Sequence, residues 1–408
     1  MASPRRWMAV LAGCAMVFGV SGASAQDWPQ WRGPNRDGKV SGFTAPQKWP
    51  AALTQKWKTT VGLGVSTPAL VGDKLYVFTR QGGDEITLCL SAAEGKELWQ
   101  DKYAAQAVGG PASQFPGPRS SPAVAEGKVV TLGVGGVLSC LDAATGKMAW
   151  RKDEFPKVVP QFFTATSPII ADGMCVAFLG GKDNGAVIAF DLATGNQKWK
   201  WAGDTPAYAS PVLMTLEGKK AIIAQGEKKI VGLALADGKL LWEIPTPVQG
   251  RANNSASPIV EGQTVFYTGQ GRGTRAVKIE KQGDGFEAKE LWINPQFGTG
   301  FNTPVLKDGF LYGSSDKDNF FCLSAQTGQA AWTDTVKRER FVAILDGGSV
   351  LLALPNNSEL IAYKPSDKGY EELLKIKVAD APTHAHPVIA GKRIFVKDKE
   401  SVTLWMME

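Results

Sequence analysis

Two histidines near the C-terminus are of a type that could begin a metal site. His384 and His386 are the only histidines of the chain and lie two residues apart, in Thr383-His384-Ala385-His386-Pro387. On an extended strand, residues two apart point to the same face, so both imidazoles could reach one ion. A metal site needs a third or fourth ligand, and the sequence places none beside them. The pair therefore fits a polar loop entering a strand better than a metal centre.

Two other local patterns resemble chemical motifs but lack essential parts. Asp316-Lys317-Asp318-Asn319 has alternating acidic residues without the glycine and the bidentate glutamate of a calcium loop. Gly269-Gln270-Gly271-Arg272-Gly273 is glycine-rich like a phosphate loop, but it joins two expected strands and opens no helix. The chain has no Gly-x-Ser-x-Gly nucleophile motif. Both patterns predict turns between strands, and no catalytic residue is predicted.

A tryptophan that recurs at regular intervals indicates the fold that would position any functional residues. It returns at intervals of 40 to 51 residues, as Trp57, Trp99, Trp150, Trp199, Trp242, Trp292 and Trp332. A period in the forties with units ending in Trp is typical of a β-propeller. Each of these residues is expected to end an outer strand and to pack between neighbouring sheets as a structural docking residue.

Each unit has the same internal order. It opens with a Ser-Pro or Thr-Pro pair, continues through apolar and β-branched runs, and closes on a turn such as Asp142–Lys147 before its Trp. Pro suits the first residue of an inner strand, where no ladder N–H is needed, and Gly in the turn supplies a positive φ. Four short strands make one blade, and a single blade cannot bury both its faces. The units must therefore close into a ring.

The number of units predicts eight blades. Six Pro-marked units reach residue 304, and a seventh, without its Pro and Trp, is legible in the apolar runs 341–344, 349–353 and 360–363. The eighth unit stops after three strands at Trp405, while residues 55–60 form an orphan strand at the other end. Joining the two leaves no open edge. Seven blades would follow if the seventh unit were an insertion.

The predicted fold class is therefore all-β: an eight-bladed β-propeller of four-stranded antiparallel blades, closed by an N-terminal strand that completes the last blade. Three segments are expected. Residues 1–25 form a signal peptide, residues 26–55 an N-terminal extension with a Trp-Pro-Gln-Trp-Arg-Gly segment, and residues 56–408 the propeller. No transmembrane span is expected in the mature chain.

The first 25 residues have the pattern of an export signal. Arg5 and Arg6 precede an apolar stretch, and a small-residue site, Ala-Ser-Ala, ends at position 25. A rival interpretation takes Leu-Ala-Gly-Cys, ending at Cys14, as a lipobox that would make Cys14 a lipidated N-terminus. The protein is therefore expected in the periplasm or the extracellular space, or as an outer-membrane lipoprotein if Cys14 is lipidated.

The net charge and the positions of the cysteines argue against a nucleic-acid-binding protein and against a disulfide-linked one. The formal net charge of +6 is mild for 408 residues and argues against nucleic-acid binding. Cys89, Cys140 and Cys322 occupy equivalent third-strand positions of different blades, too far apart for disulfides. Together with Cys175 they are expected as free, buried, small apolar residues. The protein is expected to be a monomer.

The repeat ending Asp-Ala-Ala-Thr-Gly-Lys-Met-Ala-Trp at Asp142–Trp150 resembles the PQQ-type β-propeller repeat family, and the resemblance runs over residues 56–408. Two groups of relatives matter: quinoprotein dehydrogenases, with PQQ and Ca²⁺ in a central funnel, and the non-catalytic BamB-like propellers of outer-membrane protein assembly. The opening Asp27–Pro34 looks like the N-terminal segment of uncharacterised secreted bacterial PQQ-like propellers.

The resemblance does not by itself imply an enzyme. The dehydrogenases hold a vicinal cysteine pair over the quinone, and this chain has no adjacent cysteines and no Cys-x-x-Cys-His haem motif. Some relatives lack the pair as well. The expectation is therefore no cofactor and no metal, with a PQQ-dependent quinoprotein oxidoreductase holding PQQ and Ca²⁺ as the alternative.

One face of the ring is the expected binding face. It carries the loops before each inner strand and the loops between second and third strands, which are rich in Arg, Asn and aromatic residues. This is the composition of interaction hot spots, although loops are also polar simply because they face water. The candidate binding residues are Arg80, Arg119, Tyr208, Arg251, Asn253, Asn254, Arg272, Arg275, Asn302, Arg340, His384 and His386.

These observations lead to three functional hypotheses. The first is an exported, non-catalytic propeller that serves as a binding or protein-interaction scaffold, with another envelope protein or a small polar or anionic ligand as its partner. The second is a quinoprotein oxidoreductase. The third is a BamB-like lipoprotein in outer-membrane protein assembly.

Overall fold

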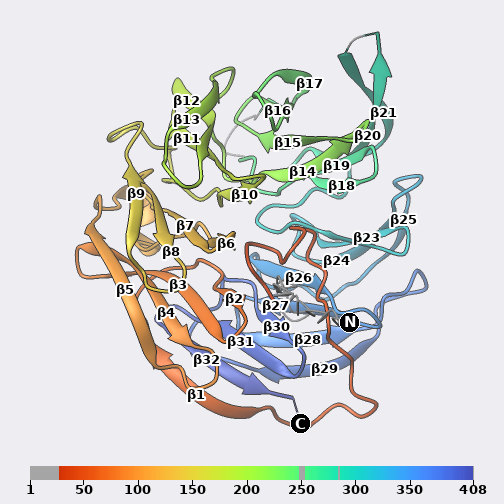
Figure 1. Cartoon of the computed structure of the whole chain (residues 1–408). Coiled ribbons are helices and arrows are strands. Elements are labelled where there is room, and N and C mark those ends of the chain that lie inside the picture. The colour runs from red at the N-terminus through yellow and green to blue at the C-terminus, as the bar shows by residue number, and fades with distance from the viewer. Residues whose placement is uncertain (1–26, 248–252, 284, 408) are drawn as a thin grey trace, which may run out of the picture.

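The computed structural model describes residues 27–247, 253–283 and 285–407, and they form a closed ring of eight four-stranded antiparallel sheets (Figure 1). The expected signal peptide and Cys14 lie outside the described residues. The predicted fold class is confirmed, and the seven-bladed alternative is wrong because the degenerate seventh unit forms a complete sheet. The only helix in the described part of the chain is the 3₁₀ turn η1 (Gly110–Gln114). No helix there is long and apolar enough to cross a membrane.

The first four blades follow one another along the chain, each from its inner to its outer strand. Blade 1 consists of β2 (Ala69–Val71), β3 (Lys74–Gln81), β4 (Asp84–Ser91) and β5 (Glu97–Ala104). Blade 2 consists of β6 (Ala123–Ala125), β7 (Lys128–Leu132), β8 (Leu138–Asp142) and β9 (Met148–Lys152). Blade 3 consists of β10 (Ile169–Ala171), β11 (Met174–Gly181), β12 (Asn184–Asp191) and β13 (Gln197–Trp201). Blade 4 consists of β14 (Val212–Leu216), β15 (Lys219–Gln225), β16 (Lys229–Ala234) and β17 (Leu240–Pro245).

The second half repeats this order until the last blade. Blade 5 consists of β18 (Ile259–Glu261), β19 (Thr264–Gly269), β20 (Gly273–Gln282) and β21 (Gly285–Asn294). Blade 6 consists of β22 (Val305–Lys307), β23 (Phe310–Ser314), β24 (Phe320–Ser324) and β25 (Ala330–Thr333). Blade 7 consists of β26 (Val342–Asp346), β27 (Leu351–Pro355), β28 (Glu359–Tyr363) and β29 (Glu372–Lys377). Blade 8 consists of β30 (Val388–Ala390), β31 (Arg393–Lys397), β32 (Ser401–Met406) and β1 (Thr54–Thr60).

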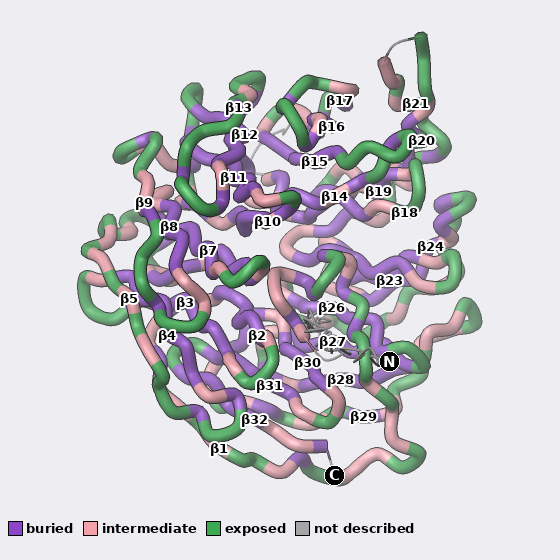
Figure 2. Tube along the Cα trace, in the orientation of Figure 1, coloured by how far each residue is buried: buried purple, intermediate pink, exposed green. Residues whose placement is uncertain are grey.

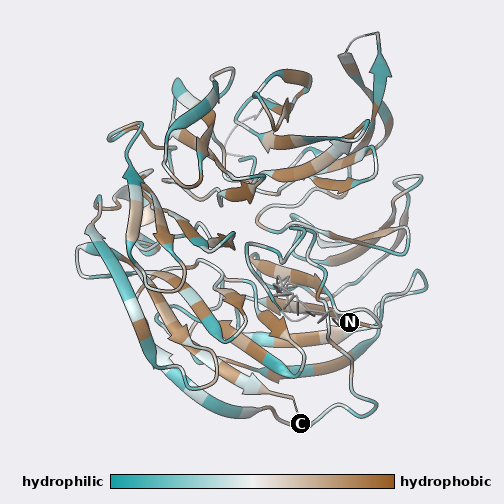
Figure 3. Cartoon of the chain, in the orientation of Figure 1, coloured by the Kyte–Doolittle hydropathy of each residue, from teal (hydrophilic) through white to brown (hydrophobic). Residues whose placement is uncertain are grey.

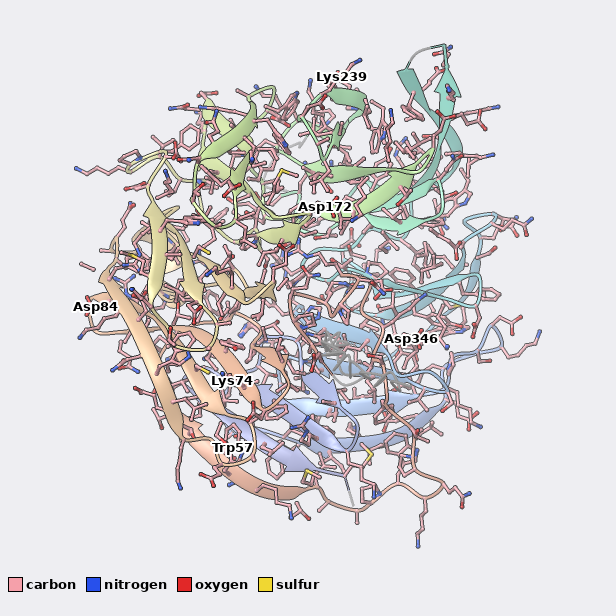
Figure 4. The ribbon with its side chains drawn as sticks, in the orientation of Figure 1. Trp57, Lys74, Asp84, Asp172, Lys239 and Asp346 are labelled. Carbon is pink, nitrogen blue, oxygen red and sulfur yellow. The ribbon has the colours of Figure 1, made fainter. Side chains whose placement is uncertain are left out.

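The ring closes through the N-terminal strand, as predicted. β1 pairs antiparallel with β32, with Trp57 opposite Leu404, and it forms the outermost strand of blade 8 (Figure 4). Closure of this kind joins the two ends of the chain in one sheet and gives the last blade the same four strands as the others.

Burial decreases from the centre of the ring to its rim. The second and third strands are buried along most of their length, whereas outer strands such as β5 alternate between exposed and half-buried residues (Figure 2). The hydropathy follows the same order, with apolar inner strands and a largely hydrophilic β5 (Figure 3). Apolar side chains between adjacent blades therefore make up the core.

Where a blade carries the recurring Trp, this residue contacts the following blade. The indole N–H of Trp150 donates to the carbonyl of Leu192 (2.9 Å) and that of Trp199 to Leu235 (2.8 Å), in both cases across to the following blade. These contacts fit the predicted docking role, which stays a prediction, whereas the expected place at the end of the outer strand is wrong. Trp150 is the third residue of β9, because pairing with the third strand continues beyond it.

The turn glycine has a second reason to be Gly. Gly195 has φ +73, and a Cβ there would lie 2.7 Å from Cγ of Trp150 in the preceding blade. The Trp ring thus lies against the bare backbone of the neighbouring turn, and any larger residue would push the two blades apart. The regular positions of Trp and Gly in the repeat therefore reflect both the geometry of the turn and the contact between neighbouring blades.

The Ser-Pro and Thr-Pro pairs form a belt of hydrogen bonds around the channel. The N–H of Ser121 donates to Oγ of Ser167 (3.0 Å), and the N–H of Ser167 donates to Oγ of Ser210 (2.9 Å). The same bond recurs between other neighbouring blades. At one end of the series the N–H of His386 donates to Oγ1 of Thr67, and at the other end the N–H of Ser257 donates to Oγ1 of Thr303. Each hydroxyl accepts a backbone N–H that has no strand partner, which explains why the residue before Pro is Ser or Thr.

We expect Ser167→Ala to lower the free energy of unfolding by about 1–3 kcal/mol, because it leaves the N–H of Ser121 unpaired at a buried position. The urea midpoint of the full-length protein would measure this. Ser366→Ala removes a hydroxyl from a surface turn, where it accepts from Lys368 N–H, and should change stability by less than about 0.5 kcal/mol. Equal midpoints for the two variants would contradict the structural role of the belt.

The N-terminal extension is packed inside the ring. The N–H of Trp28 donates to Leu70 of β2 (2.8 Å), Val124 of β6 donates to Pro29 (2.8 Å), and Val40 donates to Asp346 of β26 (2.8 Å). These three partners are inner strands of blades 1, 2 and 7, and Figure 1 shows the red N-terminal segment crossing the middle of the ring. The boundary at residue 55 stays a prediction, but residues 27–40 fill the channel that the propeller surrounds. We call them the plug.

Candidate functional site

Antiparallel strand order places two sets of loops on one face of the ring: those before each inner strand and those between second and third strands. We call this side the funnel face. At its centre lies a cavity of about 360 Å³, within the size range of small-molecule sites. Loops before the inner strands supply most of its wall, and the plug supplies Trp31. Its main side chains are Trp31, Phe115, Arg119, Phe162, Tyr208, Asn253, Phe301, Phe341, His384 and His386.

One side of the cavity is a wall of aromatic rings from four blades. Phe301 stacks on Phe341 with ring centroids 4.5 Å apart, and His384 meets the edges of Phe115 and Phe341, both at 4.9 Å. Phe115 follows the 3₁₀ turn η1 in the connection between β5 and β6, so this connection brings a ring against the loops before blades 7 and 8. Stacked and edge-to-face rings at these distances form a rigid apolar surface.

The opposite side of the cavity is polar and centres on the backbone of Phe162. The Arg119 guanidinium donates to the carbonyl of Phe162 (2.6 Å) and to that of Phe115 (2.9 Å). The Tyr208 hydroxyl accepts the N–H of Phe162 (3.0 Å), so its own proton is free to donate. Arg119 and Tyr208 therefore flank the same residue, and both present donors at one end of the cavity.

The cavity has a positive charge that no acidic side chain of its lining balances. Arg119 is held by carbonyl oxygens alone, and the lining residues include neither Asp nor Glu. Burial lowers the pKa of Arg119, and the guanidinium stays charged at neutral pH. Glu85, a buried acidic residue outside the lining, attracts the guanidinium, but its carboxylate oxygens accept from Tyr103 and Val134, and burial raises the pKa of this carboxyl. A partly buried cation that has no carboxylate hydrogen-bonded to it favours an anion as a further partner.

Two further arginines lie behind the floor, in the plug. Arg32 donates to the carbonyls of Thr303 and Pro304 (both 2.9 Å), and Arg36 donates to those of Pro211 (2.6 Å) and Pro168 (2.7 Å). These carbonyls belong to the Ser-Pro and Thr-Pro pairs whose other atoms make the belt. Trp31 lies over both guanidinium groups, 5.6 Å from Arg32 and 6.0 Å from Arg36, and presents its ring to the cavity.

The two histidines lie in the loop before β30, as the sequence predicts, and contact different rings. His384 belongs to the aromatic wall, whereas His386 faces Trp31 with ring centroids 6.0 Å apart. Burial lowers the pKa of His386 to about 3, so its imidazole is neutral, and its buried Nδ1 has no hydrogen-bond partner. Within the described part of the chain, no group of three or more His, Cys, Asp or Glu is placed to hold a metal ion.

The structure brings five of the predicted binding residues into the cavity: Arg119, Tyr208, Asn253, His384 and His386. Arg340 lies at its rim, with its guanidinium 4.9 Å from the centre of the Phe301 ring, and is exposed. Arg251 lies outside the described residues. That these residues bind a partner stays a prediction.

The remaining predicted residues have partners within the scaffold. Asn302 makes two hydrogen bonds with the backbone of Ser314. Arg80 donates to the carbonyls of Gln106 and Pro116 and so holds the loop before β6. The last three predicted residues, Asn254, Arg272 and Arg275, belong to blades 4 and 5. Arg272 donates to Asn254 Oδ1, and Arg275 pairs with Glu290.

Sequence reasoning missed Trp31, Phe115 and Phe341 as parts of the site. The opening Trp-Pro-Gln-Trp-Arg-Gly segment was a signal for Trp31, but the repeat shows nothing about where this segment lies. The glycine-rich stretch 269–273 and the stretch 316–319 are turns between strands, as predicted, and Gly271 N–H donates to Asp316 Oδ2 (2.9 Å). The four cysteines of the described chain, Cys89, Cys140, Cys175 and Cys322, are buried and free.

The lining does not fit the calcium ion that accompanies PQQ in the dehydrogenase relatives. Calcium is held by six to eight oxygen ligands, usually including carboxylates, whereas the cavity offers a guanidinium and no carboxylate. The floor is a tryptophan backed by two cations, which would repel a divalent ion. The absence of a cofactor stays a prediction.

The eight blades, the docking Trp of each repeat and the central funnel define a PQQ-like β-propeller. The chain belongs to the family described as outer membrane protein assembly factor BamB, whose model matches residues 84–334. It is 26% identical over 355 residues to the outer membrane protein assembly factor BamB of Burkholderia pseudomallei, covering 84% of this chain and 85% of that one.

Two solved structures illustrate the range of proteins with this fold. BamB from Moraxella catarrhalis matches with a TM-score of 0.66 at 15% identity, over 88% of this chain and 98% of its own. A quinohemoprotein alcohol dehydrogenase from Pseudomonas putida HK5 matches with a TM-score of 0.68 at 14% identity, over 94% of this chain and 80% of its own. The fold is thus shared by assembly factors and dehydrogenases, and the residues of the funnel must distinguish them.

Proposed function

We infer that the protein is an exported, non-catalytic scaffold that binds another envelope protein through its funnel face and serves the assembly of outer membrane proteins. One observation carries this inference: the relative from Burkholderia pseudomallei, matched over 84% of this chain and 85% of its own length, is an outer membrane protein assembly factor. Export is supported by the signal pattern of residues 1–25.

The chemistry of the funnel supports a binding role over catalysis. PQQ-dependent oxidation needs a carboxylate base and a calcium ion beside the quinone, and the lining supplies no carboxylate. What the funnel face does offer is exposed cationic side chains around a fixed aromatic centre, such as Arg340 on blade 7 and Lys317 on blade 6. Cations and aromatic rings of this kind are typical of protein-binding surfaces.

The test is complementation of a strain that lacks this protein. We expect such a strain to contain less β-barrel protein in its outer membrane, and the full-length protein to restore the amount. The double variant Arg340→Glu with Lys317→Glu should fail to restore it and should bind the assembly machinery about tenfold more weakly, because rim charges set the association rate. Immunoblots of outer-membrane fractions and co-purification with the assembly machinery would measure both effects.

The matched control is the opposite face. Lys219, the first residue of β15, and Lys392, in the turn between β30 and β31, are exposed lysines where first and second strands connect. The pair Lys219→Glu with Lys392→Glu makes the same change of charge on that face. Both double variants should unfold within about 0.5 kcal/mol of the parent. Normal outer-membrane protein levels in the deletion strain, or equal loss with the control pair, would contradict the inferred role of the funnel face.

A further inference from the structure

The cavity of the funnel face has features that a protein-binding surface does not require. It is a space of about 360 Å³ that opens to the funnel face and is lined by a cluster of aromatic rings and by the guanidinium of Arg119. Ligand pockets of this kind combine an apolar body with a few convergent polar groups that set the orientation of the ligand. This asymmetry identifies the chemistry of a ligand independently of any protein partner.

We propose that this cavity binds a small organic carboxylate with an aromatic body, without a metal ion, the ring lying along Phe301 and Phe341 and the carboxylate at Arg119 and Tyr208. A flat ring suits the aromatic end because Phe301 and Phe341 form a stacked pair there, with His384 edge-on beside them. The site differs from a quinone site in its lack of carboxylate ligands for calcium.

The polar end selects a carboxylate. Arg119 donates hydrogen bonds to the carbonyls of Ala112, Phe115 and Phe162, none of which carries a negative charge. Tyr208 uses its hydroxyl oxygen as an acceptor and keeps its proton for a ligand. A guanidinium and a hydroxyl on either side of one residue match the two oxygens of a carboxylate, and charge-assisted hydrogen bonds of this type are the strong ones.

The floor adds to the selectivity for an anion. Trp31 covers the guanidinium groups of Arg32 and Arg36, which are hydrogen-bonded to carbonyl oxygens, with Asp37 as an acidic neighbour of Arg32. Their positive potential extends into a space walled by apolar rings, where electrostatic interactions are weakly screened. A cationic ligand would be repelled by all three arginines.

The test is direct binding to the purified full-length protein by isothermal titration calorimetry. Naphthalene-2-carboxylate carries both the ring and the charge, naphthalene-2-carboxamide keeps the ring without the charge, and acetate keeps the charge without the ring. We expect saturable binding of the carboxylate below about 1 mM, at least tenfold weaker binding of the carboxamide, and none of acetate. Equal affinities for carboxylate and carboxamide, or no saturable binding of the carboxylate, would overturn the proposal.

Variants separate the two ends of the cavity. Arg119→Gln should weaken the carboxylate at least tenfold and leave the carboxamide within about twofold, whereas Phe301→Ala should weaken both ligands by about fivefold. Arg275→Gln is the matched control, an arginine paired with Glu290 away from the cavity, and should change neither affinity. Unchanged carboxylate binding in Arg119→Gln would refute the assignment. If Arg119→Gln shifts the unfolding midpoint, Phe301→Ala still decides whether the ligand lies against the aromatic wall.

Isothermal titration calorimetry can also test whether the carboxylate belongs to the end of a polypeptide or to a free aromatic acid. The tripeptide Ala-Ala-Phe, with a free and with an amidated C-terminus, presents an aromatic ring and a carboxylate at the end of a chain. Tighter binding of the free tripeptide than of naphthalene-2-carboxylate would assign the site to a polypeptide terminus, and the reverse order to a free aromatic acid. Because these titrations use only the isolated protein, their failure would leave the inferred role in outer-membrane assembly untouched, and failure of complementation would leave the ligand site untouched.

Discussion

Deletion of residues 26–60 is expected to abolish cooperative unfolding. The deletion removes β1, so β32 becomes an open edge of blade 8, and it also removes the docking of Trp57 at the turn of blade 1, where its indole N–H donates to Ala92 (3.2 Å). The unpaired edge at the rim of blade 8 favours intermolecular strand pairing. The central channel also loses its plug. Circular dichroism during urea unfolding and gel filtration should reveal loss of the sharp transition and aggregation.

The shorter deletion of residues 26–50 distinguishes the plug from ring closure. The sequence alone suggests a milder effect, because β1 remains. The structure leads us to expect a large one, since removal of Arg32 and Arg36 leaves four buried carbonyls of three Pro-marked starts unpaired, each costing about 1–3 kcal/mol. The fully buried Trp28 is lost as well. A 26–60 deletion with the parent's unfolding midpoint would contradict closure through β1, and a neutral 26–50 deletion would contradict the plug.

Trp150→Ala is expected to lower the free energy of unfolding by about 3–5 kcal/mol, as for other large buried aromatic side chains. Trp150 is 6% exposed, packs against Phe190 and Gly195 of blade 3, and donates its indole N–H to Leu192. Its removal leaves a cavity between two blades and an unpaired carbonyl. Urea unfolding followed by circular dichroism would measure the loss.

The control for this variant is an apolar residue of the same kind of strand that faces water. Leu98, next to Trp99 in β5, is 51% exposed, and Leu98→Ala should change the midpoint little. A Trp150→Ala protein as stable as Leu98→Ala would show that Trp150 does not dock the blades. Gly195→Ala should reproduce part of the loss from the other side of the contact, because its Cβ would meet the Trp150 ring.

Much of the fold could be predicted because a blade is a local structure. Its four strands are consecutive, its turns are short, and the apolar pattern, the Ser-Pro or Thr-Pro start and the Gly before the Trp repeat with each unit. Even the closure of the ring followed from this regularity, since one missing strand at the C-terminal end matched one surplus strand at the N-terminal end. Within a blade the place of Trp was misjudged, because the outer strand continues past it along its partner.

The candidate site was predicted only in part. Arg119, Tyr208, Asn253, His384 and His386 were found because they lie in loops whose face follows from strand order. Phe341 was taken as part of a strand, although it precedes β26 and lines the cavity. Asn302 and Arg80 were grouped with the binding residues because they are polar loop residues, while their hydrogen bonds to the backbone hold the loops in place.

The sequence by itself determined the eight blades, the identity of the closing strand and the face that carries the loops, because each depends on a pattern that recurs or on strand alternation. Only the tertiary structure decided that residues 27–40 fill the channel, that Trp31 is the floor of the cavity and that Arg119 is hydrogen-bonded there by carbonyl oxygens alone. The physical reason is separation along the chain. Arg32 finds its carbonyls 271 and 272 residues away, and such a contact leaves no periodic trace in the sequence.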